Sequence, residues 1–306
     1  MIESKPILIV FKYQRDFAFG NIRKPSIFEF LRIYNNLTVK LATTMRKNYQ
    51  NIQTCPSINP DDYEITQQIR RVTFGCLRMA REKRTGSKVV MKFISNPEKD
   101  VLNSFYRSFN ACTLDFPGIH KLIGYSFPKT NDPSDSFIIV TEYMENGTLE
   151  IFNYRHKHST KNNPTIRSKI IFGISAIMKK VHESNIIHRN LEPDHIYLDS
   201  NFEPQIGNFS LSTFVDDTHD IRPEMGAPIY ISPEALKNEE YGTSTDVYSY
   251  AIILYRMFTN DFLFENGQDA KRFANQYMHI GYSVIQGICY VKPANIPEHY
   301  WELIQR

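Results

Sequence analysis

Apolar and polar positions divide this chain of 306 residues into a strand-rich stretch followed by a helix-rich one. Runs of β-branched and aromatic residues between turn signals predict short strands over residues 63–69, 76–81, 88–94, 120–125 and 137–143. Later apolar positions recur at helical spacing and predict helices over residues 165–184, 246–259 and 269–281. Another helix is expected near residues 97–114. Strands followed by helices predict an α+β fold, with a small β-rich lobe before a larger helical lobe.

Residues 1–60 have a different pattern and are expected to form a separate segment. Ser26 and Glu29 have the spacing of a helix capping box, and apolar residues follow at helical spacing, so residues 27–48 should form one amphipathic helix. Two interpretations of this helix stay open. It packs on the neighbouring domain, or its basic polar face binds a partner or a membrane surface. Residues 51–60, which contain two prolines, are expected to be a linker.

Composition narrows the classes of protein that fit. Apolar residues make up 42% of the chain and charged residues 23%, which is typical of a folded globular protein. The net charge is +3, and the first 60 residues carry nine Lys and Arg against three Asp and Glu. No dense basic cluster accompanies this excess, so no nucleic-acid partner is expected. No apolar run is long enough for a transmembrane segment, and the four scattered cysteines favour a reducing, cytoplasmic location.

Seven motifs in the second part of the chain resemble those of the protein kinase superfamily, in the same order and at similar spacing. They are the Gly-rich loop over residues 69–77, a V-A-I-K-like strand over 89–92, a hinge over 141–147, a catalytic loop HRNLEPDH over 188–195, a D-F-G-like segment over 206–210, an A-P-E-like segment over 232–234 and the start of a central helix over 246–250. The resemblance covers about residues 61–306. Residues 121–125 and the hinge are most similar to the tyrosine-kinase-like group.

The resemblance implies the two-lobed protein-kinase-like fold. The smaller lobe should cover about residues 61–143 and the helical lobe about residues 148–306. The family has further helices after the segment that matches residues 301–306, so the helical lobe is expected to be truncated in this chain.

The catalytic positions of the family hold unsuitable residues here. Asn190 stands at the position of the catalytic base, and an amide does not accept a proton at neutral pH. His195 and Asn208 stand at the two metal-binding positions, where neutral side chains replace the oxygen-rich or anionic ligands that magnesium prefers. Glu192 stands beside the substrate hydroxyl and would repel a phosphate. The resemblance therefore implies a pseudokinase, with no bound metal.

The nucleotide site is changed as well. Arg70 and Val72 replace the first two glycines of the phosphate loop, and Val90 and Tyr197 add bulk above and below the expected position of the base. Lys92 matches the lysine that contacts nucleotide phosphates in the family, but its glutamate partner is not found at Arg107 or Ser108. The positions that match the family's cofactor-binding residues are Ile69, Gly75, Leu77, Val90, Lys92, Thr141 and Met144.

The sequence predicts a catalytically impaired protein-kinase-like domain that works as a signalling scaffold or an allosteric partner. Two alternatives stay open, an atypical active ATP-dependent serine/threonine kinase and a module that binds nucleotide without metal. ATP binding through Lys92 is expected to be weak or absent, and magnesium is not expected to bind. The expected partners are other signalling proteins, an active kinase among them.

Overall fold

The computed structural model describes residues 56–72, 75–95, 114, 116–126, 136–156, 163–215, 227–237, 239, 242–259, 292–294 and 296–305. The chain divides into two compact units, residues 1–54 and residues 55–306, and every described residue belongs to the second. The helices predicted over residues 27–48, 97–114 and 269–281 lie outside the described residues. Within the described part, no helix is both long and apolar enough to cross a bilayer.

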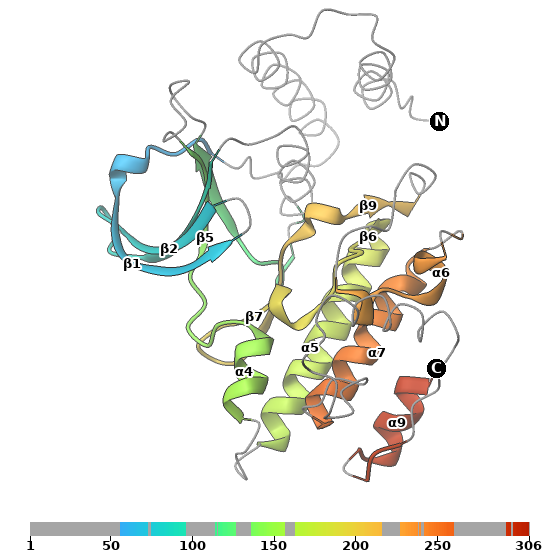
Figure 1. Ribbon diagram of the computed structural model, residues 1–306. Helices are drawn as coiled ribbons and strands as arrows, with labels where there is room; N and C mark the ends of the chain where they lie inside the picture. Colours follow the sequence, from blue (N-terminus) through green and yellow to red (C-terminus); the bar gives the residue numbers. More distant parts are fainter. Residues whose placement is uncertain are drawn as a thin grey trace, which may run out of the picture. The chain divides into compact units, whose positions relative to one another are not determined.

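The smaller lobe is one antiparallel sheet of five strands in the order β1-β2-β3-β5-β4 (Figure 1). The strands are β1 (Tyr63–Val72), β2 (Gly75–Glu82), β3 (Lys88–Ser95), β4 (Leu122–Ser126) and β5 (Ser136–Glu142). Neighbouring residues of a strand point to opposite faces, so the register separates two sets of side chains. One face is the hydrophobic core of the lobe, built on Ala80, Val89, Met91, Ile138 and Val140. The opposite face carries several of the predicted nucleotide-site residues.

The larger lobe is mostly helical. Its principal helices are α4 (Leu149–His156), α5 (Pro164–Glu183), α7 (Ser244–Thr259) and α9 (Glu298–Gln305), and a short helix α6 covers Pro233–Leu236. Asn163 caps α5 by accepting a hydrogen bond from the Thr165 amide at 3.0 Å, and Pro164 occupies the first turn, where its missing N–H costs nothing. Figure 1 shows α5 and α7 side by side, and their apolar faces build a single core.

Short elements lie between α5 and α7 and carry the catalytic-loop motifs. They are strands β6 (Ile186–Ile187), β7 (Ile196–Leu198), β8 (Pro204–Ile206) and β9 (Thr213–Phe214), with the 3₁₀ turns η2 (Pro193–His195), η3 (Phe209–Leu211) and η5 (Pro228–Tyr230). Strand β6 pairs with β9, and β7 pairs with β8. A further 3₁₀ turn, η1 (Pro60–Asp62), precedes β1.

The predicted fold class is confirmed. Strands β1, β2 and β3 extend the predicted ones by one to three residues at an end, β4 begins two residues later and ends one residue later than predicted, and β5 is shifted by one residue. Helices α5 and α7 lie within two residues of their predicted bounds. The sequence did not predict β6 to β9. Strands of two or three residues are too short to show a hydrophobic period, and they form here because tertiary contacts bring their partners together.

Candidate nucleotide and catalytic site

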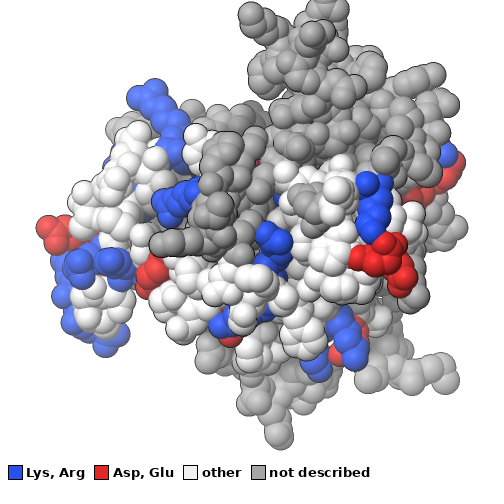
Figure 2. Space-filling model, turned by 90° about the horizontal axis from the view of Figure 1, so that it is seen from below, with Lys and Arg blue, Asp and Glu red and all other residues white. Residues whose placement is uncertain are grey.

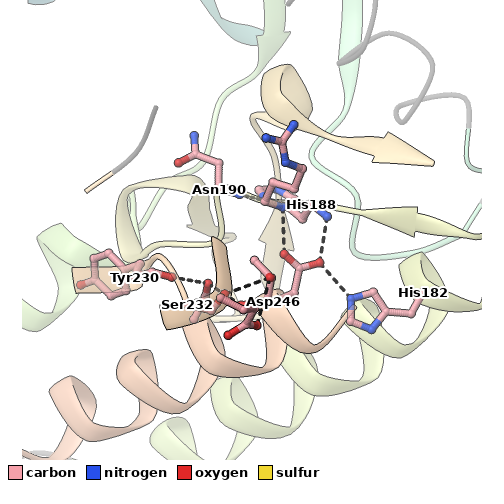
Figure 3. Close-up of polar contacts among 10 residues, drawn as sticks. His182, His188, Asn190, Tyr230, Ser232 and Asp246 are labelled. Carbon is pink, nitrogen blue, oxygen red and sulfur yellow. Dashed lines mark hydrogen bonds and ion pairs between the residues drawn. The ribbon is translucent and has the colours of Figure 1, made fainter. Parts of the chain in front are cut away.

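Asp246, at the start of α7, holds the catalytic-loop segment in place (Figure 3). Its carboxylate is 1% exposed and accepts hydrogen bonds from the backbone amides of His188 and Arg189, both at 2.8 Å, and from His182 Nε2 at 2.9 Å. A buried carboxylate keeps its charge only when donors of this kind compensate it. Asp246 therefore fixes the backbone of the loop at His188 and Arg189.

His188 connects this loop to the segment that follows β8. Its buried ring donates from Nε2 to the Gly207 carbonyl at 2.9 Å and lies 4.6 Å from the Phe209 ring, edge to face. Burial lowers the pKa of His188, so the ring is neutral. Its Nδ1 accepts from the Asn190 amide at 3.2 Å. The catalytic loop, the D-F-G-like segment and the start of the central helix, three of the motifs in the sequence, are thus in contact.

The two predicted metal positions bond to each other. His195 Nδ1 faces the Asn190 carbonyl oxygen at 2.9 Å, and because a carbonyl only accepts, Nδ1 carries the proton. His195 Nε2 is then an acceptor, and Asn208 Nδ2 donates to it at 2.6 Å. Ser210 Oγ donates to Asn208 Oδ1 at 2.9 Å. Burial lowers the pKa of His195 to about 4, which keeps the imidazole neutral.

Asn208 adopts the left-handed conformation, with φ 57° and ψ 52°. Asparagine tolerates this region better than most residues, because its short polar side chain can bond locally. The conformation turns the amide toward His195 and Ser210. Both the amide nitrogen and the amide oxygen of Asn208 therefore form hydrogen bonds within the protein. Among the described residues, no group of three or more His, Cys, Asp or Glu could hold a metal ion.

Glu192 lies against the same histidine, with Oε1 3.3 Å from His195 Nε2. Burial, followed by the negative charges of Asp194 and Glu150, raises the pKa of Glu192 to about 7, and the charge of Arg256 opposes this shift. The lone pair of His195 Nε2 already accepts from Asn208, so Glu192 contacts this nitrogen without a hydrogen bond to it.

Strand register brings four predicted nucleotide-site residues to one sheet face. Leu77 pairs with Lys92 across β2 and β3, and Val90 pairs with Thr141 across β3 and β5. The Lys92 side chain is exposed to solvent, but the surrounding protein still lowers its pKa by desolvation, and the charge of Arg70 lowers it further. Within the described part of the chain, no carboxylate lies within ion-pair distance of Lys92.

The other three predicted positions have local reasons for their residue types. Gly75 has φ 152°, and a Cβ there would come within 1.8 Å of the Phe93 carbonyl oxygen, so the close approach of β3 requires glycine at this position. Ile69 is 46% exposed and lies at an irregularity of β1. Met144 is buried, and its carbonyl accepts from the Gly147 amide at 3.1 Å.

The sequence did not identify one residue of this region, His120. Its ring stacks on Tyr197, with centroids 4.1 Å apart and planes at 26°, and its Nε2 donates to the Glu142 carbonyl in the hinge at 3.0 Å. Burial lowers the pKa of His120 to about 4 and raises that of Tyr197 to about 12. His120 belongs to none of the seven motifs. Its place at the start of the strand predicted over residues 120–125 does not indicate a contact with Tyr197.

Arg256 and Glu150 form a second cluster that the sequence did not indicate. The buried guanidinium of Arg256 on α7 binds the Glu150 carboxylate of α4 through two nitrogens, at 2.8 and 2.9 Å. Tyr230 adds its hydroxyl to the same guanidinium nitrogen. This bidentate pair connects two helices of the larger lobe, and its two members act in opposite directions on Glu192, whose pKa Glu150 raises and Arg256 lowers.

The fold and the site together define a protein of the kinase class. A sequence model described as the protein kinase domain matches residues 63–306, and the chain belongs to this family. The chain is similar to the serine/threonine-protein kinase SIK1 of Mus musculus, with 29% identity over 63% of this chain and 24% of that protein. It is also similar to the probable serine/threonine-protein kinase MARK-C of Dictyostelium discoideum (30%, over 68% and 27%) and to the carbon catabolite-derepressing protein kinase of Candida glabrata (28%, over 70% and 34%).

These similarities correct one expectation. Two of the three relatives are serine/threonine kinases by name, and none supports the tyrosine-kinase-like placement. The matched part spans about a quarter to a third of the length of these curated relatives. Their complete activities and partners are therefore not transferred to this chain.

Proposed function

We propose that this kinase domain does not transfer phosphate and works by binding other signalling proteins, an active kinase among them. The observation that carries the proposal is the 2.6 Å hydrogen bond between Asn208 and His195. Phosphoryl transfer depends on metal ions that neutralise charge on the phosphates. Here both metal positions are neutral, and their polar atoms bond to each other or to neighbouring residues.

The residue at the base position supports the same proposal. Asn190 cannot accept the proton of an attacking hydroxyl, and its backbone carbonyl accepts from His195. A scaffold role needs only a stable fold, and the hydrogen bonds to Asp246 stabilise the catalytic loop. The cytoplasmic location expected from the cysteines stays a prediction.

An active serine/threonine kinase is the second candidate, because the names of the relatives favour it. Transfer of labelled phosphate from ATP to a generic protein substrate separates the two. We expect no transfer above background with magnesium or manganese. Transfer that depends on Lys92, and that is lost on Lys92→Met, would establish the active kinase instead.

Metal dependence is a second, independent test. We expect ATP to raise the melting temperature no more with magnesium than with EDTA, because Asn208 and His195 offer the ion no charged ligand. A substantially larger shift with magnesium would contradict the proposal. Asn208→Asp provides the matched control, since it adds one carboxylate at the same position.

A further inference from the structure

Contacts with the turn between β2 and β3 hold the chain where it enters the smaller lobe. Figure 2 shows Lys and Arg next to Asp and Glu in this lobe, on the left of the view. The side-chain ammonium of Lys83 donates to the backbone carbonyl of Asp61 at 2.6 Å, and the Lys83 amide donates to the Asp62 carbonyl at 2.9 Å. The turn η1 is therefore fixed to the sheet.

Residues 56–58, which precede η1, pair with the outer edge of β4. The Ile58 amide donates to the Tyr125 carbonyl at 2.8 Å, and the Tyr125 amide donates to the Pro56 carbonyl at 3.3 Å. Ser57 lies opposite Tyr125 in a parallel bridge. Because β4 is the last strand in the order of the sheet, these residues cover its edge, although the sequence predicted a linker here.

Gly124, in the middle of β4, makes room for this segment. A Cβ at Gly124 would lie 2.2 Å from Ile58 Cγ2 and 2.8 Å from the Pro56 carbonyl oxygen. Gly124 does not have a positive φ, so the space taken by Ile58, rather than backbone freedom, accounts for the glycine. Ile58 is half-buried and packs against the core of the smaller lobe. A glycine weakens a strand because it has no side chain to pack, so β4 depends on residues 56–58 for this packing.

The stretch of chain that contains β4 begins in contact with the larger lobe. Ile119 forms a parallel bridge with Ile206 of β8. The His120 amide donates to the Ile206 carbonyl at 2.8 Å, and the Ile206 amide donates to the Gly118 carbonyl at 2.7 Å. Strand β8 leads directly into the D-F-G-like segment. Residues 118–126 therefore connect the segment on the β4 edge to the candidate site.

We propose that residues 56–58 are a releasable latch, and that their release from β4 loosens residues 118–126 and, with them, the pairing of β8. Two backbone hydrogen bonds and one half-buried side chain hold the latch, and contacts as few as these open locally without global unfolding. One end of the latch is fixed by η1, and at the other end the chain continues into residues 1–54. A protein that binds those residues better when the latch is open would shift the equilibrium. The inference holds whether or not the domain transfers phosphate.

Hydrogen exchange of backbone amides in the full chain tests the proposal. We expect Ile58→Gly to accelerate exchange about tenfold at Tyr125 and also at His120 and Ile206, relative to amides in the middle of α7. Ile65→Gly is the matched control, because Ile65 is 46% exposed and lies on β1, at the opposite end of the sheet order. It should leave exchange at His120 unchanged. Acceleration confined to Tyr125 would show a purely local contact, equal acceleration in α7 would show global unfolding, and either result would overturn the proposal.

A double-variant cycle tests the fit of the latch to β4. Gly124→Ala places a methyl group against Ile58 and should accelerate exchange at His120 about tenfold. In the Ile58→Gly background the same change should add less than about twofold, because the latch is already released. Gly242→Ala is the control, since a Cβ there meets no atom within 4 Å. Fully additive effects of the two changes would contradict the latch, whereas phosphate transfer to a protein substrate would overturn only the proposed function.

Discussion

At the scale of single residues, Glu192 is a carboxyl group whose ionisation the fold opposes. Its folded pKa of about 7 lies above the ordinary value of 4.5, with Asp194, Glu150, Arg256 and His195 as its charged or titratable neighbours. The folded protein therefore keeps a proton that the unfolded chain releases between pH 4.5 and pH 7. Stability from this group is present at low pH and is lost as the pH rises through that window.

We expect Glu192→Gln to be more stable than the parent at pH 8, by at most about 3 kcal/mol, and to gain little at pH 5. Denaturant unfolding of both proteins at the two pH values measures the difference. Glu203→Gln is the control, because Glu203 is an exposed residue paired with Lys169 on the surface. An equal change at both pH values would show that the carboxyl keeps its ordinary pKa.

Restoring acids at the catalytic positions is the second test at this scale. We expect Asn190→Asp with Asn208→Asp to stay near background in phosphate transfer. The pair provides a base and one metal ligand, but His195 still occupies the second metal position and Arg70 still replaces a loop glycine. Each misplaced group costs on the order of tenfold or more.

The same double variant with His195→Asn is the informative comparison. Clear transfer by the double variant alone would show that only the two acids are missing. Transfer that begins with the triple variant would assign the defect to the metal positions.

Single residues also show which features could be predicted from the sequence and which could not. The order of motifs placed Leu77, Val90, Lys92 and Thr141 on neighbouring strands, and the observed register brings them to one face of the sheet. Their part in nucleotide binding stays a prediction. The bond between Asn208 and His195 could not be predicted, since it depends on the left-handed backbone of Asn208 and on contact between segments 13 residues apart. The position of His120 was missed for the same reason, because only the folded chain brings it to Tyr197.

At the scale of elements, the start of α7 acts as a fixed point for the catalytic loop. Asp246 accepts two backbone amides and one imidazole N–H, so its removal leaves buried donors without partners. We expect Asp246→Ala to lower the free energy of unfolding by about 3 kcal/mol or more, since each unsatisfied buried donor costs about 1–3 kcal/mol.

Asp246→Asn keeps one acceptor oxygen and should fall between the alanine variant and the parent in denaturant unfolding. A loss below about 1 kcal/mol for Asp246→Ala would show that the loop finds other acceptors. Long helices such as α5 and α7 were predictable from the helical spacing of their apolar residues. The short strands β6 to β9 depend on tertiary contacts such as those of Asp246, and they were not predicted.

At the scale of the whole molecule, the question is what residues 1–54 add. Residues 55–306 form a compact unit of their own, and the match to the protein kinase domain lies within it, over residues 63–306. We therefore expect a protein that begins at residue 55 to fold cooperatively. If the predicted helix over residues 27–48 packs on the domain, removal of the segment lowers the melting temperature by several degrees, because each buried large apolar side chain contributes about 1.5–3 kcal/mol.

Calorimetric melting of the full and shortened proteins measures this, with circular dichroism as the control for folding. An unchanged melting temperature would instead favour a helix that is free to bind a partner. A shortened protein that fails to fold would contradict the independence of the second unit.

The stacked pair of His120 and Tyr197 has a practical consequence for finding this protein in a cell. Affinity resins that carry heteroaromatic kinase inhibitors retain their targets through the base-binding region. Because Tyr197 stands at the position below the expected base and is stacked on His120, we expect such resins to leave this protein in the flow-through, and inventories of expressed kinases built by that route to omit it.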